Sequence, residues 1–184
     1  MRTTMMKSLF VAVLAINLSV FAGVKNPIKL GKSTVSWIGK KVTGAHEGTI
    51  ALKAGDVILE DGALAGGTFV VDMTTIDVTD LEGEYKGKLE GHLKSDDFFG
   101  VAKFPEATFV ITSVEGSIVK GDLTIKGHTE EQSFDLITKD NTISGKVMID
   151  RTKFGIKYGS GSFFDNLKDK AIDDEFELNV NILF

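Results

Sequence analysis

The chain has 184 residues, with 21 Lys and Arg against 26 Asp and Glu, and a formal net charge of −5. A mildly acidic chain of one-domain length, without a basic cluster in its sequence, argues against nucleic-acid binding and against electrostatic binding to anionic membranes. The absence of cysteine excludes disulfides, thiolate metal sites and cysteine nucleophiles.

Residues 1–22 predict a cleaved secretory signal peptide. Arg2 and Lys7 are followed by an apolar run and by small residues ending at Ala22, which is the order that a signal peptidase reads. A buried core helix is the alternative, and the order of these features disfavours it. The apolar run is too short to span a membrane stably, and no cysteine follows it. We therefore expect a periplasmic or secreted domain of residues 23–184, without a stable membrane anchor.

The chain before residue 78 is expected to form strands. Residues 34–42 and 68–74 alternate between apolar and polar side chains, which is the period of a β-strand. Gly55-Asp56 and Asp61-Gly62 are typical turn dipeptides, and they predict a short strand at 57–60 between them.

The period then changes to that of a helix over residues 80–93. Thr79 or Asp80 could cap it. Its apolar residues recur every four positions, at Leu81, Tyr85, Leu89 and Leu93. A second stripe consists of Gly83, Gly87 and Gly91. Each glycine costs a helix roughly 1 kcal/mol against alanine. The stripe therefore indicates either close approach of a backbone or a ligand, or a frayed and irregular segment.

A connection from His92 to Ser113 joins the helix to the second half of the chain. It contains Phe98-Phe99 in polar surroundings, and Phe104-Pro105 then forces an extended start to the next strand. A second pair, Phe163-Phe164, also lies between expected strands. Such pairs either plug the ends of a core or gate an apolar pocket.

Alternation continues from Phe109 to the C-terminus, with turns at Glu115-Gly116, Lys126-Gly127-His128 and Asp140-Asn141. This pattern predicts an all-β fold, an antiparallel barrel of about eight strands with one α-helix. A sandwich is the competing architecture. Gly39, Gly121 and Gly145 fall on the inward face, where small residues leave space and favour an internal cavity.

Catalytic and metal-binding patterns are not found in the sequence. The segment Gly159-Ser160-Gly161-Ser162 lacks the strand-to-helix setting of a nucleophile elbow. The histidines are far apart and have no partners at metal spacing: His46, His92 and His128. Asp72, Asp135 and Asp150 fall on outward positions. We therefore expect no catalytic residue, no metal and no cofactor.

Five segments, in order, resemble the YceI-like family, whose exported members have a lipocalin-like barrel and bind polyisoprenoid or related long-chain lipids. They are Ser33–Trp37 (STVSW), Asp72–Asp77 (DMTTID), His92–Phe99 with Lys103–Phe109 (HLKSDDFF and KFPEATF), Gly121–Gly127 (GDLTIKG) and Asp150–Ile156 (DRTKFGI). The similarity covers nearly all of the chain after residue 22. Lys40-Lys41 and Leu89-Glu90-Gly91 depart from the family's usual residues, so a head-group preference set there would not carry over.

The resemblance implies a non-catalytic protein that holds a long-chain isoprenoid or acyl lipid in its lumen, and a homodimer by resemblance only. The expected tunnel residues are Trp37, Phe69, Val71, Met73, Phe109, Ile111, Leu123, Ile125, Phe134, Leu136, Phe176 and Leu178. Those expected near its mouth are Phe98, Phe99, Phe163 and Phe164. The competing functions are an isomerase or hydrolase of amphipathic substrates in the same barrel, and a filled barrel that binds another protein.

Overall fold

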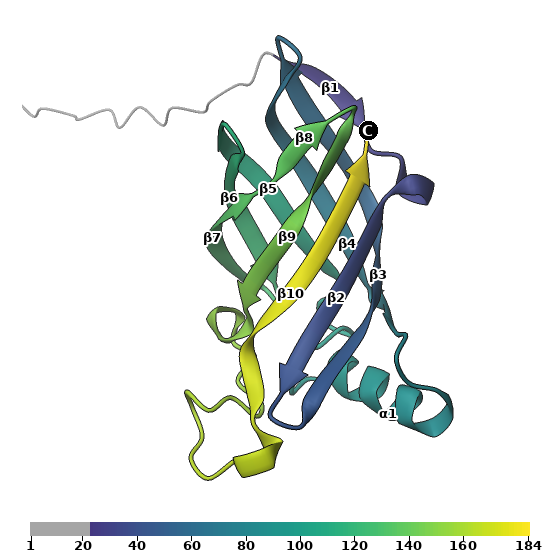
Figure 1. The fold of residues 1–184 in the computed structure, drawn as a ribbon, viewed down its shortest axis with the longest axis vertical. Helices are drawn as coiled ribbons and strands as arrows, with labels where there is room; N and C mark the ends of the chain where they lie inside the picture. The colour runs from purple at the N-terminus through teal and green to yellow at the C-terminus, as the bar shows by residue number, and fades with distance from the viewer. Residues whose placement is uncertain (1–22) are drawn as a thin grey trace, which may run out of the picture.

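The structure, a computed structural model, describes residues 23–184 and shows one tall, curled antiparallel sheet with a short helix at one end (Figure 1). The predicted signal peptide lies outside the described residues. The strands are β1 (Val24–Pro27), β2 (Thr34–Lys41), β3 (Gly44–Glu60), β4 (Ala63–Val78), β5 (Glu106–Glu115), β6 (Ile118–Ile125), β7 (His128–Asp135), β8 (Ile137–Lys139), β9 (Thr142–Asp150) and β10 (Ile172–Leu183). The helices are α1 (Gly83–Lys94) and the 3-10 turns η1 (Leu30–Lys32), η2 (Arg151–Phe154) and η3 (Lys168–Lys170).

The sheet follows the order β7-β6-β5-β4-β3-β2-β10-β9-β8, and β1 pairs with β3 beside this path. β7 and β8 are successive, with only Leu136 between them. β7 pairs with β6, whereas β8 pairs with β9 through Ile137 opposite Ser144. The same stretch of chain thus joins the two margins of the curled sheet. The barrel prediction is confirmed, with ten strands instead of about eight.

The two ends of the barrel differ in their connections (Figure 1). The tight β6–β7 turn at Lys126-Gly127 lies at the end opposite the C-terminus. We call the end that carries the C-terminus and the β3–β4, β5–β6 and β8–β9 turns the turn end. Its hairpins turn at Asp61-Gly62 and Asp140-Asn141, where all four residues have positive φ (50°, 82°, 52° and 59°). These are the angles of type I′ turns, which suit the twist of paired strands. The turn predictions at these dipeptides are therefore confirmed.

The other end, which we call the loop end, carries the β2–β3 hairpin tip, α1, residues 95–105 and the connection from β9 to β10 (Figure 1). The last connection consists of η2 and of residues 155–171, which include η3 and which we call the 155–171 loop. Long connections leave room here for side chains that belong to no strand.

The predicted turn at Gly55-Asp56 is wrong, because β3 runs unbroken over 17 residues. Gly55 lies inside the strand where other atoms come close. A β-carbon there would lie 2.8 Å from Ile28 Cδ1 and 2.9 Å from the Thr68 carbonyl oxygen. The glycine thus permits close packing within the sheet instead of a reversal of the chain.

The helix begins later than the expected residue 80, and neither proposed cap caps it. Glu82 is the N-cap and makes no side-chain capping bond. The Asp80 carboxylate instead pairs with His46 Nδ1 at 2.8 Å and accepts the Glu47 N–H at 3.1 Å. Thr79 N–H donates to the Glu47 carbonyl at 3.0 Å. Both residues tie the approach to α1 onto β3.

The glycine stripe of α1 faces open space. A β-carbon at these positions would have no atom of the described chain within 4 Å: Gly83, Gly87 and Gly91. The segment is also a regular α-helix from Gly83 to Lys94. The stripe is therefore neither a close approach to another described backbone nor an irregular segment.

Candidate functional site

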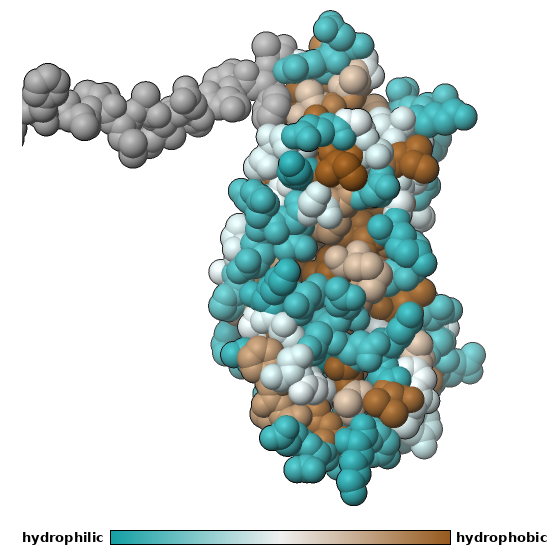
Figure 2. All heavy atoms as spheres, turned by 60° about the vertical axis from the view of Figure 1, so that its left-hand side comes forward, coloured by the Kyte–Doolittle hydropathy of each residue, from teal (hydrophilic) through white to brown (hydrophobic). Residues whose placement is uncertain are grey.

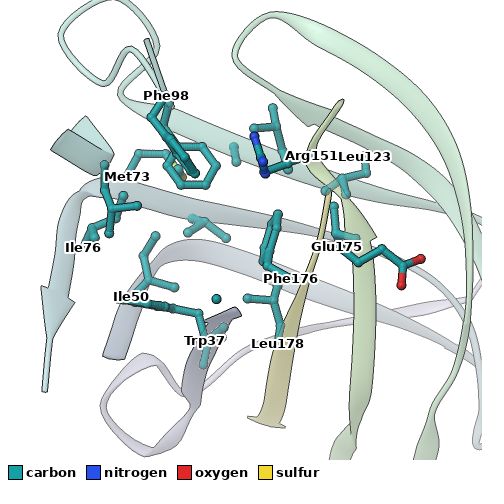
Figure 3. A pocket seen from close by; sticks show the side chains of 18 of the residues that line it. Trp37, Ile50, Met73, Ile76, Phe98, Leu123, Arg151, Glu175, Phe176 and Leu178 are labelled. Atoms are coloured by element: carbon teal, nitrogen blue, oxygen red, sulfur yellow. The ribbon is translucent and has the colours of Figure 1, made fainter. Parts of the chain in front are cut away.

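An apolar cavity of about 130 Å³, which we call the chamber, lies inside the loop-end half of the barrel (Figure 3). Its walls come from β2 and from the loop-end halves of β3, β4, β5, β6, β9 and β10, with Leu93 of α1 and Phe98-Phe99 above them. The lining residues are Val35, Trp37, Gly39, Lys40, Ile50, Val71, Met73, Ile76, Leu93, Phe98, Phe99, Ala107, Leu123, Ile125, Ile149, Arg151, Ile172, Asp173, Glu175, Phe176 and Leu178.

More than half of the predicted site residues lie around the chamber. Trp37, Met73, Phe176 and Leu178 point toward its centre (Figure 3). The predicted residues in the wall are Trp37, Val71, Met73, Phe98, Phe99, Leu123, Ile125, Phe176 and Leu178. Strand alternation located seven of them because inward side chains of neighbouring strands meet in one lumen. Phe98 and Phe99 were instead singled out as an apolar pair in a polar connection. That the predicted wall residues contact a ligand stays a prediction.

The remaining strand residues of the prediction lie away from the chamber, in the turn-end half, where side chains fill the lumen. They are Phe69, Phe109, Ile111, Phe134 and Leu136. The Phe109 and Phe134 rings pack 5.4 Å apart. Burial in a filled core replaces the tunnel wall expected at these positions.

The inward glycines show why the lumen is filled there. A β-carbon at Gly121 would lie 2.7 Å from Phe109 Cζ, and one at Gly145 would lie 2.7 Å from Leu136 Cδ2. The expectation that these two glycines leave space is wrong, because neighbouring side chains occupy it. At Gly39, which lines the chamber, an added β-carbon would meet no atom within 4 Å.

The two phenylalanine pairs have different surroundings. Phe98 is buried, and its ring meets that of Phe99 at 5.1 Å, which in turn lies 6.2 Å from Phe176. This pair forms the roof of the chamber. Phe163 and Phe164 lie in the 155–171 loop and are 47% and 51% exposed, and neither lines the chamber.

The sequence interpretation missed Arg151, which is 1% exposed and contributes to the chamber wall. Its guanidinium donates to the carbonyls of Asp173, Ile156 and Ile172 at 3.0, 2.9 and 3.0 Å. Its charge lies 5.5 Å from the Phe98 ring. Burial lowers the pKa of Arg151, and the nearby Asp174 opposes that change. The only sequence signal was the Asp150–Ile156 segment, where Asp150 caps η2 by accepting the Thr152 N–H at 2.9 Å.

Arg151 ties the end of β9 to the start of β10 beside the Phe98-Phe99 roof. Three backbone carbonyls and the Asp174 carboxylate, 3.8 Å from Arg151 Nη2, surround the guanidinium. Burial alone would raise the pKa of Asp174, but hydrogen bonds from Ser160 and Ser162 and the Arg151 charge lower it. The guanidinium therefore has a structural role, holding together the backbone around it.

A second cavity, of about 480 Å³, adjoins the chamber at the loop end, and we call it the mouth. The two share wall residues: Trp37, Gly39, Lys40, Leu93, Phe98 and Ile172. The mouth is bounded by the β2–β3 hairpin tip, α1 and the 155–171 loop. Its polar lining residues are Lys40, Lys41, Thr43, His46, His92, Tyr158, Asp169 and Lys170. An apolar interior thus leads to a polar opening.

His92 lies between the roof and the mouth. Its ring is 5.4 Å from the Phe98 ring and 4.5 Å from the Tyr158 ring. Its Nε2 is shielded from solvent and has no hydrogen-bond partner among the described residues. A buried polar atom without a partner costs free energy, so this nitrogen could bond to a group that enters the mouth.

Acidic side chains do not converge on the chamber. Asp72 accepts from Thr74, and Asp150 caps η2. The Glu175 carboxylate points away from the chamber centre (Figure 3). Within residues 23–184, no cluster of His, Cys, Asp or Glu side chains could hold a metal ion. No helix in that part of the chain is long and apolar enough to cross a membrane.

The geometry defines a single-domain antiparallel barrel with an internal apolar chamber. A family model described as the YceI-like domain matches residues 27–184, and the chain belongs to this family. Among curated relatives, a UPF0312 protein of Staphylococcus aureus (strain USA300) is 42% identical over 80 residues, which are 38% of this chain and 47% of that protein. The chain therefore spans about half the length of the curated relatives that it matches.

Solved structures share the fold. Burkholderia cenocepacia BcnA is 23% identical, with a TM-score of 0.65 over 85% of this chain and 99% of that one. A polyisoprenoid binding domain from Saccharophagus degradans is 12% identical, with a TM-score of 0.60 over 87% of this chain and 97% of that one. At such identities the likeness shows the barrel architecture alone.

Proposed function

We propose that this protein is a non-catalytic carrier that holds one end of a long isoprenoid or acyl chain in the chamber, with the polar head of the lipid in the mouth. The single observation that carries this proposal is the apolar chamber, which is blocked inward by the filled turn-end half and opens outward to a polar mouth. Membership of the YceI-like family and the polyisoprenoid-binding neighbour support it.

The size of the chamber limits how much of the ligand it holds. A dry protein cavity of about 150 Å³ binds one benzene, so about 130 Å³ holds a short tail segment. Each methylene removed from water contributes about 0.8 kcal/mol. A tail of roughly five carbons would then contribute roughly 4 kcal/mol. A longer chain must continue through the mouth or displace the Phe98-Phe99 roof. Selection would follow cross-section more than chemistry.

The proposal also includes export of the protein from the cytoplasm. The signal-like features of residues 1–22 support a periplasmic or secreted protein that stores, shuttles or protects its lipid outside the cytoplasm. Homodimerisation stays a prediction from the family resemblance.

Native mass spectrometry tests the function directly, on protein purified without detergent after expression of the full chain. Gly39→Leu should fill the chamber without a backbone clash, because an added β-carbon there meets no atom within 4 Å. Gly31→Leu is the matched control, since Gly31 in η1 is also unobstructed and lies far from the chamber. We expect a prenyl or acyl lipid on the wild type and on Gly31→Leu, and none on Gly39→Leu.

Two results would contradict the function. The first is equal lipid retention by Gly39→Leu and the wild type, because the chamber would then not be the site. The second is a lipid-free wild type that also fails to take up added prenyl alcohols and fatty acids. The second result would favour a barrel that binds another protein.

A further inference from the structure

The loop end exposes apolar side chains, of which Tyr158 also lines the mouth. We call this group the exposed apolar rim, and it consists of Val42, Tyr158, Phe163 and Phe164, which are 67%, 49%, 47% and 51% exposed. In Figure 2, hydrophobic side chains also reach the surface at the lower end of the molecule. Exposed aromatic side chains gathered at one place mark an interaction surface more often than single ones do.

The rim is held in place by specific contacts. Val42 N–H donates to the Ala171 carbonyl at 3.2 Å, which joins the hairpin tip to the 155–171 loop. The Tyr158 ring packs 4.5 Å from His92 at the end of α1. These contacts bring three separate connections together around one opening.

The phenylalanine pair is presented by a buried anchor. Ser160 is fully buried, and its carbonyl accepts the N–H groups of Phe163 and Phe164 at 3.2 and 3.0 Å. Its hydroxyl accepts the Ser162 N–H at 3.2 Å, and the Ser162 hydroxyl donates to Asp174 at 2.5 Å. The loop thus has a defined conformation that directs both rings outward, although their exposure is unfavourable in water.

Lysines surround the rim, although they are scattered in the sequence. Lys157 Nζ lies 4.5 Å above the Phe163 ring. The others are Lys40, Lys41, Lys168 and Lys170, from the hairpin and the loop. Among the described residues, none of these five lysines lies within 4 Å of a carboxylate. The hairpin tip and the 155–171 loop carry these five lysines against Asp165 and Asp169, and Asp173, Asp174 and Glu175 follow directly at the start of β10.

We propose that the loop end docks on an anionic lipid bilayer, with Phe163 and Phe164 at head-group level and the lysines over the lipid phosphates. Aromatic rings favour the membrane interface, and each lysine near an anionic surface adds to binding. The mouth then faces the bilayer, so a tail passes into the chamber without crossing bulk water. This inference rests on the proposed carrier function and supplies the source of its ligand.

A second copy of the chain is a weaker occupant for this surface. A two-fold contact through the loop end would place the same lysines of two copies against each other. Juxtaposed like charges oppose association, whereas an anionic bilayer complements them.

Co-sedimentation with vesicles tests the docking on purified protein. We expect binding to vesicles that contain phosphatidylglycerol, at least tenfold weaker binding to pure phosphatidylcholine, and loss of binding in high salt. Phe163→Ser with Phe164→Ser, and separately Lys168→Gln with Lys170→Gln, should each weaken binding about tenfold. The matched controls are Ile137→Ser and Lys139→Gln in β8 at the turn end, where both side chains are well exposed.

The outcomes separate docking from ligand binding. Gly39→Leu should dock normally but carry no lipid, and the double phenylalanine variant should dock about tenfold more weakly but still take up prenyl alcohol or fatty acid added in solution. Equal binding to both vesicle types, or wild-type binding by the double variants, would overturn the docking. A dimer that the phenylalanine substitutions dissociate, without any vesicle binding by the wild type, would show that the rim is a self-interface instead. A wild type that docks but is lipid-free and takes up no added prenyl alcohol or fatty acid would contradict the carrier function alone.

Discussion

The filled turn end and the hollow loop end are built from the same strands. β4 contributes Phe69 to the filled half and Met73 to the chamber, and β6 contributes Gly121 to the filled half and Leu123 to the chamber. Alternation of apolar and polar residues is the same in both halves, so alternation does not determine where the lumen stays open. The decisive difference is the packing of large rings against glycines at one end and its absence at the other.

The connections between strands also differ between the two ends, and the longest of them lie at the hollow loop end. At the turn end, residues with positive φ reverse the chain within two residues and leave little beyond the sheet. At the loop end, the connections bring in a roof, a buried arginine and an exposed aromatic pair. Function is expected where loops carry the variable side chains and a rigid sheet positions them.

The largest effect on stability should come from replacing one phenylalanine in each half of the barrel by alanine. Phe69→Ala empties a filled position and should lower the free energy of unfolding by about 3–5 kcal/mol. Phe176→Ala enlarges a space that already exists and should cost about 1–2 kcal/mol, because fewer contacts are lost. Urea unfolding of lipid-free protein measures both. Equal losses would mean that the chamber half is packed as tightly as the turn-end half.

Replacing the inward glycines by alanine should have a smaller effect on stability, and the effect should differ between Gly121 and Gly39. At Gly121 a β-carbon would meet the Phe109 ring and the Val110 carbonyl, so Gly121→Ala should cost about 1–3 kcal/mol through overpacking. At Gly39 the same change meets open space and should alter the stability by less than about 0.5 kcal/mol. Thermal unfolding of the two variants makes the comparison. A costly Gly39→Ala would mean that the strand there tolerates no side chain.

The sequence predicted the barrel and nine of the 21 residues of the chamber wall, seven of them because inward parity follows directly from strand alternation. The sequence could not show that the space beside Gly39 is empty and the space beside Gly121 is filled. Whether a neighbouring side chain occupies that space depends on the three-dimensional packing. Gly55 was misassigned for a related reason. A glycine required by close packing looks the same in sequence as a glycine required by a turn.

The sequence also could not predict interactions between segments that are far apart in the chain. Arg151 is buried by carbonyls of residues 156, 172 and 173, and charged residues are expected at the surface unless such partners are known. The lysines of the loop end come from two connections more than a hundred residues apart. The sequence therefore did not show that these lysines lie at the same end of the fold.

The smallest expected effect concerns the tie between α1 and β3 at the loop end. Partial burial would raise the pKa of Asp80, but bonds from His46 and from the Glu47 N–H lower it below its usual range. The bonds therefore stabilise the fold fully above the ordinary carboxyl pKa of about 4. This stabilisation is lost as the pH falls through the lower folded value. Because the Asp80 side chain is 25% exposed, we expect less than about 1 kcal/mol.

Stability measured against pH isolates this contribution. Asp80→Asn should lower the stability near neutral pH and flatten its decline below about pH 4, because the titrating carboxylate is gone. Asp61→Asn at the turn end is the matched control. Asparagine also adopts the positive φ of that turn, so the hairpin should keep its stability near neutral pH. If Asp80→Asn and the wild type instead declined in parallel, the start of α1 would depend on packing alone.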